Sequence, residues 1–510
     1  MNPDGGWKKI PTILGTLAIL VLAALVLVGI FKPSLLRRVL LPGQPPATAP
    51  AENRTDGNAE VPSGSLGTLR FIWGVSGVGS GSKQANKNEV DGVGVDGQGN
   101  VYVSGVFNNT VNIGEGLLTL TSRGIGDIFV MKFSKTGSLL WSHQYGSTGD
   151  DNTYDVDVDQ EGSMVLNGYF AGTVDFDGIA LTSKGSQDQF VVKMSPDGKV
   201  LWAKNFGGSS GDGGNEVAVG DDGSIYAAAM SIGAFAAGSQ SFDNFGRRDS
   251  YVLKMTSGGD VQWVRNTSGT GNERLRAIAV DSEGAVFGGY EFSGDLKVGN
   301  AVYRGKGGLE GAIAKWDAQG NQLWSGYVGS AGDDMVRGIS PGPNGSFYVS
   351  GLYGKEAEVF GQSMSAEGSG SDVFIAKFGR SNTLEWIMTF SSPQDEGGGE
   401  VESDGAGNVA FSTDIYPDTT IKLNGDIVQT TSPGQKRQAA LVRIDPQGKI
   451  LSITTPDSST ESSGQTLGVS NDGRFIAQSI NFGGTLTYAG KKFTAQQGNK
   501  SFLLVFYSSE

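Results

Sequence analysis

A tryptophan returns at almost constant spacing along most of this chain. Successive members of the set lie 61, 61, 61 and 62 residues apart, and they are Trp141, Trp202, Trp263, Trp324 and Trp386. Each lies in a short apolar segment, as in GSLLWSHQYG and GKVLWAKNFG, and a degenerate copy places Ser452 at the same position. A fixed period of this length is the mark of a repeat architecture. The fold is therefore expected to be built from repeated units.

Two further landmarks recur with the same period. An apolar segment ends in Lys or Arg about 40 residues after each tryptophan, as in DQFVVKM at 188, and VGVDGQGNVYVSG from Val93 begins a series of seven turn-centred copies. Each unit reads as four short strands joined by Asp, Asn and Gly turns. Four strands repeated radially predict the blade of a β-propeller.

The two ends of the repeat region complement each other. The last copy ends after SFLLVFY, and the missing fourth strand is present near the other end as LRFIWGVSG, with Trp73 at the tryptophan position. Pairing of these segments would leave no open sheet edge, whereas an open solenoid would need capping repeats, and none is evident. We therefore predict an all-β fold: a seven-bladed β-propeller over residues 68–510, with four-stranded blades closed by an N-terminal strand that completes the last blade.

The repeat unit resembles the bacterial β-propeller repeats known as SBBP repeats. Residues 156–216 carry the resemblance best, in VDVDQEG, TVDF, LTSKGSQDQFVVKMSPDG and LWAKNFGGSSGD. The resemblance implies a propeller fold but says little about function, since the family is defined by its structural repeat. The DPxGKxLW-like segments also resemble the repeats of pyrroloquinoline-quinone dehydrogenases and their non-enzymatic relatives in outer-membrane assembly. No vicinal cysteine pair accompanies them, which argues against the quinone.

Composition narrows the chemistry. The chain has 81 glycines, no cysteine, a single histidine and a formal net charge of −14. Thiolate catalysis, Cys-ligated zinc and multi-His metal sites are thereby excluded. So acidic a body should repel nucleic acid and favour cations or basic partners.

The N-terminal region has its own composition. After a short tail, residues 1–9, an uncharged apolar segment spans residues 10–31, which is long enough for a transmembrane helix. A cleaved signal peptide would have a shorter apolar region and a nearby cleavage site, so we expect an uncleaved signal anchor. Residues 32–67 are a juxtamembrane and Pro/Gly/Ala-rich linker. These segments predict a single-pass membrane protein with its propeller on the periplasmic or extracellular side.

Acidic residues recur ten positions after the tryptophans, in the connections that lead from one blade to the next. They are Asp151, Asp212, Glu273, Asp334 and Glu396. In a closed propeller these connections emerge on one rim, so we predict that the five residues form a partner-binding face.

The densest acidic segment is GDDNTYDVDVD. It suggests a candidate calcium site at Asp150, Asp151, Asp155 and Asp157, because hard cations bind clustered carboxylate oxygens. The segment is not an EF-hand loop, and solvated turn and strand acids are the alternative. Calcium is the one cofactor that the sequence suggests.

Catalytic candidates are few. The aspartates that begin the third strand of most units, such as Asp127 and Asp188, are expected to be architectural, and the repeated tryptophans to pack between blades. His143 occupies a position that varies from unit to unit. Asp155, Glu216 and Glu400 enter the inner strands at matching positions, where a propeller glycosidase would place its acids. No catalytic residue is assigned on this basis.

These observations predict a bacterial membrane-anchored, non-enzymatic binding or scaffold module at the cell envelope. Its acidic loop face would meet a protein or polysaccharide partner, and nucleic acid is not expected as a ligand. The alternative is a surface carbohydrate-active hydrolase or lyase that uses carboxylates at the channel mouth. A spacer or assembly module remains a third possibility.

Overall fold

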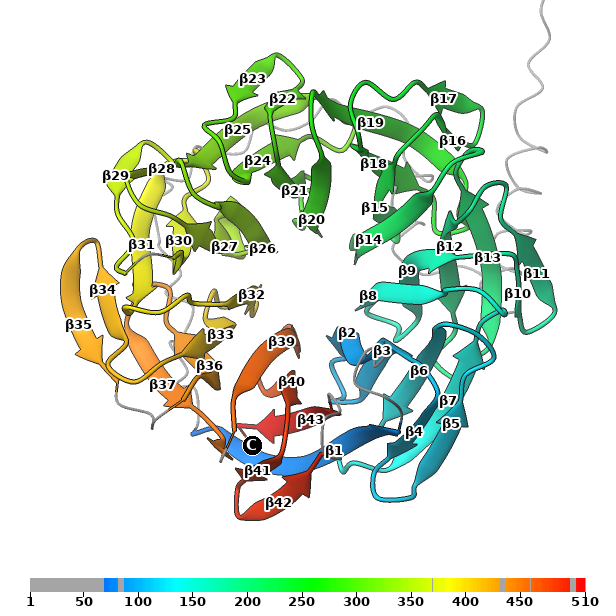
Figure 1. Ribbon diagram of the computed structural model, residues 1–510, viewed down its shortest axis with the longest axis horizontal. Coiled ribbons are helices and arrows are strands. Elements are labelled where there is room, and N and C mark those ends of the chain that lie inside the picture. Colours follow the sequence, from blue (N-terminus) through cyan, green and yellow to red (C-terminus); the bar gives the residue numbers. More distant parts are fainter. Residues whose placement is uncertain are drawn as a thin grey trace, which may run out of the picture. The chain divides into compact units, whose positions relative to one another are not determined.

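The computed structural model describes residues 68–80, 87–368, 370–431, 436–458, 460–495 and 501–509. Antiparallel sheets are arranged in a ring around a central axis, as Figure 1 shows. The β-propeller fold that the repeats predict is confirmed. We name each blade by its innermost strand.

The blades follow one another around the ring in the order of the chain. The β2 blade contains β2 (Asn88–Val95), β3 (Val101–Phe107), β6 (Asp127–Phe133) and β7 (Leu139–Tyr145). The β8 blade contains β8 (Asn152–Val158), β9 (Met164–Phe170), β12 (Asp188–Met194) and β13 (Val200–Phe206). The β14 blade contains β14 (Asp212–Val219), β15 (Ile225–Ser231), β18 (Asp249–Met255) and β19 (Val261–Gly269). The β20 blade contains β20 (Glu273–Val280), β21 (Val286–Phe292), β24 (Glu310–Trp316) and β25 (Gln322–Gly329).

The remaining blades continue in the same order. The β26 blade contains β26 (Met335–Pro341), β27 (Phe347–Tyr353), β30 (Asp372–Phe378) and β31 (Leu384–Ser391), with a 3-10 turn at Pro343–Gly345. The β32 blade contains β32 (Gly398–Ser403), β33 (Val409–Ile415), β36 (Gln438–Ile444) and β37 (Ile450–Thr454). The β39 blade contains β39 (Ser462–Val469), β40 (Phe475–Phe482), β43 (Ser501–Ser508) and β1 (Arg70–Ser80).

The ring closes through the pairing of its two ends. β1 pairs antiparallel with β43, with Arg70 opposite Ser508 and Val78 opposite Ser501. In Figure 1 the blue strand β1 lies beside the red strand β43. Trp73 of β1 stacks on Phe506 at 5.2 Å and donates its indole N–H to the carbonyl of Lys135 in the β2 blade, at 3.1 Å. The N-terminal strand thus joins the last blade to the first.

A hairpin between the second and third strands of each blade reaches back toward the preceding blade. The hairpins are β4 (Thr110–Ile113) with β5 (Leu118–Thr121), β10 (Thr173–Phe176) with β11 (Ile179–Thr182), β16 (Phe235–Ala237) with β17 (Gln240–Phe242), β22 (Asp295–Val298) with β23 (Ala301–Arg304), β28 (Ala357–Val359) with β29 (Gln362–Met364), β34 (Thr420–Leu423) with β35 (Asp426–Thr430), and β41 (Thr485–Tyr488) with β42 (Lys491–Thr494). Four of them pair with the outer strand of the neighbour: β4 with β1, β22 with β19, β28 with β25 and β34 with β31.

This hairpin pairing corrects the predicted architecture of seven four-stranded blades. In the described part of the chain, four sheets have six strands, because each takes in the hairpin of the next repeat, and three sheets have four. The hairpin β41–β42 forms a separate small sheet with β38 (Asp457–Ser458). The repeat motifs predict the strands but do not show which neighbouring blade a hairpin joins. The number of strands in each sheet could therefore not be predicted from the sequence.

The predicted membrane anchor at residues 10–31 lies outside the described residues. Where the structure describes the chain, no helix is long and apolar enough to cross a membrane, since its elements are short strands and one 3-10 turn. The prediction of a single-pass membrane protein at the cell envelope is therefore corrected: no described segment supports it, and it plays no part in the function proposed below.

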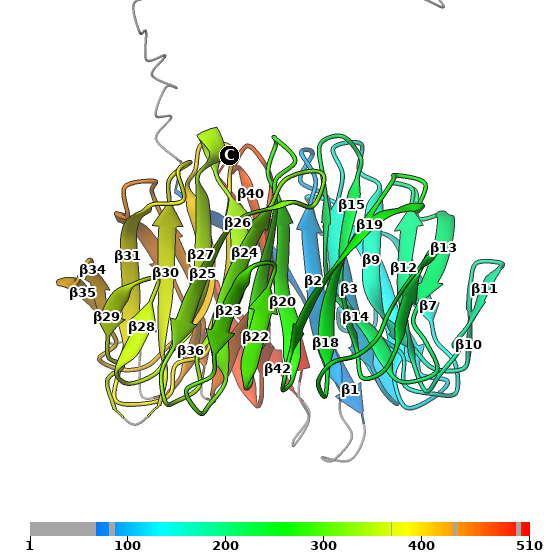
Figure 2. The same cartoon turned by 90° about the horizontal axis from the view of Figure 1, so that it is seen from above.

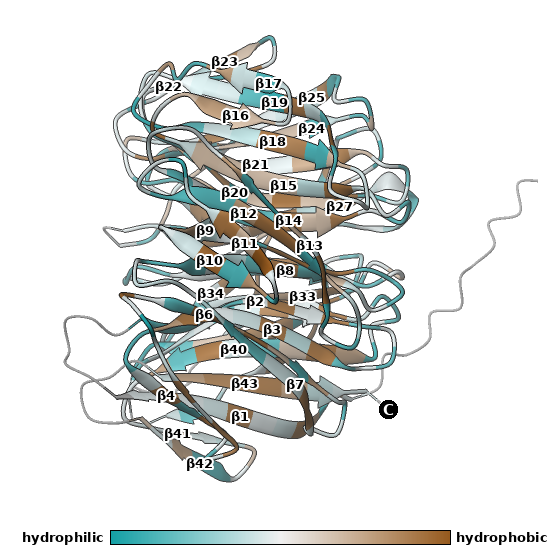
Figure 3. Ribbon diagram, turned by 90° about the vertical axis from the view of Figure 1, so that its right-hand side faces the viewer, coloured by the Kyte–Doolittle hydropathy of each residue, from teal (hydrophilic) through white to brown (hydrophobic). Residues whose placement is uncertain are grey.

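The core lies between adjacent blades. The middle strands are buried along their whole length, as in β3, β6, β9 and β12. Tyr102 and Val130 of the β2 blade pack in one cluster with Leu166 and Phe190 of the β8 blade. Figure 2 shows the blades edge-on, and Figure 3 shows apolar residues alternating with polar ones along the strands. Each blade therefore depends on its neighbours for burial of its faces.

The turn between the first two strands explains the repeated Asp-x-x-Gly motif. Asp96 accepts hydrogen bonds from the backbone N–H groups of Gln98 and Asn100, both at 2.9 Å. Gly99 then adopts a φ of +81°, which favours glycine because a Cβ is strained there. The same device recurs at Asp404 and Gly407.

Candidate functional site

The innermost strands aim charged side chains into the central channel. Each of them has a register shift at its middle, as between Val90 and Gly92 of β2 and between Val336 and Gly338 of β26. The same shift occurs in β8, β14, β20, β32 and β39. A β-bulge of this kind re-aims a side chain. The residues at or beside the shifts include Asp91, Glu216, Arg276, Arg337 and Glu400.

Four of these side chains, Asp91, Glu216, Arg337 and Glu400, border a cavity of about 280 Å³, which we call the channel mouth. Its charged lining consists of Asp91, Glu216, Glu400, Asp414, Arg337 and Arg437. The backbone of residues 397–399 and the polar residues 463–466 complete the wall. The charged lining thus holds four carboxyl groups and two guanidinium groups, contributed by several blades.

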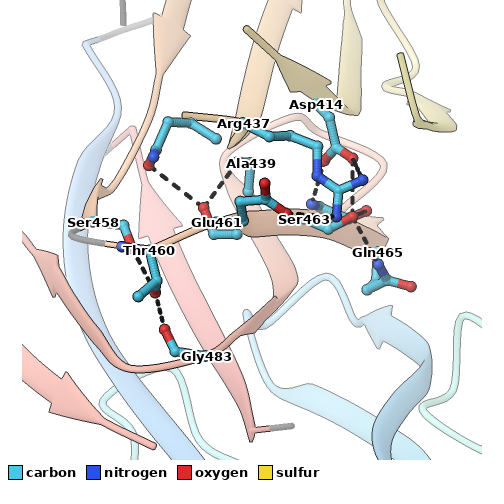
Figure 4. Close-up of polar contacts among 12 residues, drawn as sticks. Asp414, Arg437, Ala439, Ser458, Thr460, Glu461, Ser463, Gln465 and Gly483 are labelled. Carbon is cyan, nitrogen blue, oxygen red and sulfur yellow. Dashed lines mark hydrogen bonds and ion pairs between the residues drawn. The ribbon is translucent and has the colours of Figure 1, made fainter. Parts of the chain in front are cut away.

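Asp414 and Arg437 form one side of the channel mouth, shown in Figure 4. The Asp414 carboxylate accepts hydrogen bonds from the Gly464 N–H at 2.9 Å and the Ser463 hydroxyl at 3.0 Å. Arg437 lies 3.8 Å from Asp414 and 3.9 Å from Glu461. Burial raises the pKa of Asp414 to about 6, although Arg437 opposes this shift. Hydrogen bonds from Gly464 and Ser463 thus hold Asp414 in place, whereas the ion pairs of the Arg437 guanidinium are long.

Arg337 projects into the same cavity from β26. It forms no hydrogen bond or ion pair with the residues that the structure describes, and its Nε is buried without a partner. Desolvation lowers its pKa, while Glu400 acts in the opposite direction. Asp91 has a similarly unpartnered buried oxygen, Oδ2, and burial raises its pKa well above the usual range. Unpartnered buried polar atoms of this kind call for an explanation.

Carboxyl groups form two tiers along the channel. Asp155 and Glu216 hydrogen-bond to each other, and Glu400 lies close enough to raise the pKa of Glu216 further. Burial raises the pKa of Asp155 to about 6 and that of Glu400 to about 7. The second tier holds Asp157, whose pKa burial raises to about 7, and Glu402, whose pKa rises well above its usual value. The channel therefore holds more carboxyl groups than its arginines neutralise.

Asp155 and Asp157 also have a structural task. Asp155 accepts hydrogen bonds from the N–H groups of Val156 and Val217, at 2.7 and 2.9 Å. Asp157 accepts from Val158 and Val219, both at 2.7 Å. The two side chains of β8 thereby supply acceptors to N–H groups on the inner edge of β14, which has no neighbouring strand on that side among the described residues.

The four candidate calcium ligands have different surroundings. Asp150 pairs with Lys87 at 2.8 Å, and Asp151 accepts hydrogen bonds from Ser147 and from the Ala171 N–H. Asp155 and Asp157 face the channel as described above. Across the described ranges, no group of three or more His, Cys, Asp or Glu residues is arranged to hold a metal ion. The calcium site stays a prediction from the sequence.

The predicted partner face needs correction, because its side chains are buried. Asp151, Asp212, Glu273, Asp334 and Glu396 are between 0% and 4% exposed. They brace the rim: Asp334 accepts hydrogen bonds from the Ser330 hydroxyl and the Gly354 N–H, and Asp212 from the Gly208 N–H. Spacing alone placed them on one rim but could not show that they point inward.

The prediction that grouped Asp155, Glu216 and Glu400 near the channel agrees with the structure. Sequence reasoning missed Arg276, Arg337, Asp414 and Arg437. The bulge position would have shown the first two, since aligned repeats place Asp, Tyr, Asn, Arg, Arg, Gly and Gln there. A residue that packs in the core would stay apolar from repeat to repeat. A position whose charge varies while its neighbours repeat therefore indicates a side chain that faces the channel.

Comparisons with known proteins add little detail. No model of a known protein family matches the chain. Regulatory protein FlaEY of Caulobacter vibrioides is 26% identical over 248 residues, which are 46% of this chain and 25% of that protein. The chain thus matches only about a quarter of the length of this curated relative. The resemblance to SBBP repeats rests on the repeat motifs alone.

Solved structures with a similar course of the chain include WD40 propellers. The WD40 domain of Neurospora crassa Pan2 aligns with 87% of this chain and 96% of its own, at 8% identity and a TM-score of 0.43. Sqt1 from Chaetomium thermophilum aligns with 86% of this chain and 99% of its own, at 10% identity and a TM-score of 0.40. The propeller fold is established by the strand pairings of this chain itself.

Proposed function

We propose that this β-propeller is a non-enzymatic binding module whose channel mouth accepts a basic group of a protein partner. The observation that carries the proposal is the excess of carboxyl groups around an open cavity, together with the unpartnered oxygen of Asp91. A lysine or arginine side chain would neutralise this excess and donate hydrogen bonds to it. The net charge of −14 favours the approach of such a partner.

The raised pKa values support the same partner. Burial disfavours the charged forms of Glu216 and Glu400, and a bound cation would restore them. Binding should therefore release protons near neutral pH. The affinity of the propeller for a basic partner should rise as the pH increases through about 7, the pKa of Glu400.

The proposal is tested by titrating a tetra-arginine peptide and a tetraglutamate peptide into the full 510-residue chain. We expect binding of the basic peptide alone, weakened about tenfold by Glu400→Gln. Glu161→Gln is the matched control, because Glu161 is an exposed turn residue. Equal affinity in Glu400→Gln, or no binding of the basic peptide, would refute the proposal.

A hydrolytic role is the second candidate, since burial and the neighbouring acids raise the pKa of Glu216 well above its usual value, as a general acid requires. The geometry is less favourable. Asp155 contacts Glu216 directly, whereas glycosidase acids stand about 5–10 Å apart. If the unaltered chain hydrolyses a chromogenic glycoside and Glu216→Gln does not, the result would support this role. If the unaltered chain does not hydrolyse the glycoside, the hydrolytic role is refuted.

A further inference from the structure

The repeat pattern is broken on the outer side of the β20 blade, at a place that shares no residue with the channel mouth. In five repeats the tryptophan of the outer strand donates its indole N–H to a carbonyl of the next blade's turn. The pairs are Trp73 with Lys135, Trp141 with Pro196, Trp202 with Ser257, Trp263 with Ala318, and Trp386 with Pro446, at 3.0–3.1 Å. Trp324 forms no such bond with any described residue, and its ring instead packs against Phe347 and Phe378.

Two neighbouring positions depart from the repeat as well. Gly326 stands where other repeats have His143, Lys204 and Arg265, and these long side chains cover the turn of the next blade. Arg265, for example, donates to the carbonyl of Gly320 at 2.6 Å. In that turn Asn382 replaces the glycine of the other repeats and has a φ of +59°.

The result is an open slot of about 300 Å³ between the β20 and β26 blades. Its aromatic walls are Tyr303, Trp324, Tyr327, Phe360 and Phe378. Its polar groups are Ser325, Glu358 and Asn382. A cavity of this size with aromatic walls and a few polar groups has the make-up of a small-ligand site.

Phe360 is held there under strain. It has a φ of +49°, in the left-handed region that is strained for a bulky residue. The corresponding hairpin turns use Asp177 with Gly178 and Asn424 with Gly425. The ring packs edge-on against Phe378 at 5.0 Å and so forms one end of the slot.

The polar groups of the slot restrict the chemical class of ligand that it can bind. The Asn382 Oδ1 is buried and has no hydrogen-bond partner, so it calls for a donor that an apolar ligand lacks. A cationic ligand is disfavoured, because Lys306 already lies 3.8 Å from Glu358 and 5.2 Å above the Tyr327 ring. Tyr303 and Tyr327 stack at 5.3 Å, with Tyr303 donating to the Ser325 hydroxyl at 2.6 Å.

We propose that this slot binds a neutral pyranose ring of a carbohydrate, at a site separate from the channel mouth. The apolar faces of a sugar ring pack on aromatic side chains, and its hydroxyls can donate to Asn382 Oδ1 and Glu358. This inference does not depend on the proposed protein-binding function.

The test is calorimetric titration of the full chain with neutral tetrasaccharides of glucose, xylose, mannose, galactose and N-acetylglucosamine. We expect binding of at least one, weakened about tenfold by Asn382→Gly and by Trp324→Phe. Asn382→Gly restores the residue of the sister repeats, so the turn should keep its conformation. Trp202→Phe alters the same position in another blade and should leave binding unchanged.

Three results would overturn the proposal. The first is no binding of any tetrasaccharide up to about 10 mM. The second is equal affinity in the unaltered chain and in both slot variants. The third is binding of a proline-rich peptide or of choline, tested in parallel, without binding of any saccharide.

Discussion

The molecule contains two sets of carboxyl groups whose pKa values are raised by burial, and they differ in what surrounds them. At the rim, burial and the neighbouring acids Asp249 and Asp372 raise the pKa of Glu273 to about 8 and that of Glu396 to about 9. Both glutamates are sealed, with at most 4% of their surface exposed. In the channel, Glu216 and Glu400 have raised pKa values too, but they border an open cavity.

This difference in surroundings indicates that the rim acids have a structural role and that the channel acids are available to a ligand. At five junctions between consecutive blades, a rim acid lies close to the acid that begins the third strand of the preceding blade, and the two interact electrostatically. At the other two junctions the corresponding buried residues are neutral: Gln438 and Ser462 at one, Asn88 and Ser501 at the other. Because neutral residues occupy the same positions at two junctions, the rim does not require negative charge there. The channel acids face solvent space that a ligand can fill.

The largest expected effect concerns the rim and pH. A raised folded-state pKa means that the folded protein binds protons more tightly, so this stability is present below the unfolded value of about 4.3 and is lost as the pH rises toward 8–9. Each glutamate should cost up to about 1.4 kcal/mol of unfolding free energy per pH unit in this window. Urea unfolding between pH 4 and 9 should show the slope, and Glu273→Gln with Glu396→Gln should flatten it. An unchanged slope in the double variant would contradict the account.

A smaller effect is expected where a rim acid accepts several hydrogen bonds from backbone N–H groups. Asp151→Ala leaves the N–H groups of Ser147 and Ala171 without their acceptor. It should lower the unfolding free energy by about 2–4 kcal/mol in chemical denaturation. Asp150→Ala breaks the partly exposed pair with Lys87 and the hydrogen bond that the Tyr169 hydroxyl donates at 3.2 Å, and it should cost about 1 kcal/mol. Similar losses in the two variants would show that the rim acids are not braces.

The repeat period predicted the propeller and the strands, because buried middle strands and Asp-Gly turns repeat with the fold. It did not predict the six-stranded sheets, since a hairpin such as β22–β23 carries no mark of its partner β19. Glu216 and Glu400 could be placed near the channel from their matching positions. Asp414 and Arg437 could not, because they come from a second strand and the loop before a third, and only the closed ring brings them to β39.

The smallest stability effect is expected in the channel. Among the described residues, the Glu400 carboxyl accepts no hydrogen bond, so Glu400→Gln removes a desolvated acid without orphaning a donor. The melting temperature at pH 7 should stay the same or rise, with a change in unfolding free energy below about 1 kcal/mol. A loss as large as that of Asp151→Ala would place Glu400 with the structural acids.

The most direct test of the account is the number of protons released when the basic peptide binds. Titration calorimetry at pH 7 in buffers of different ionisation enthalpy measures this number. We expect proton release that falls sharply in Glu216→Gln and Glu400→Gln and is unchanged in Glu273→Gln. Binding without proton release, or release that depends on the rim variant instead, would contradict it.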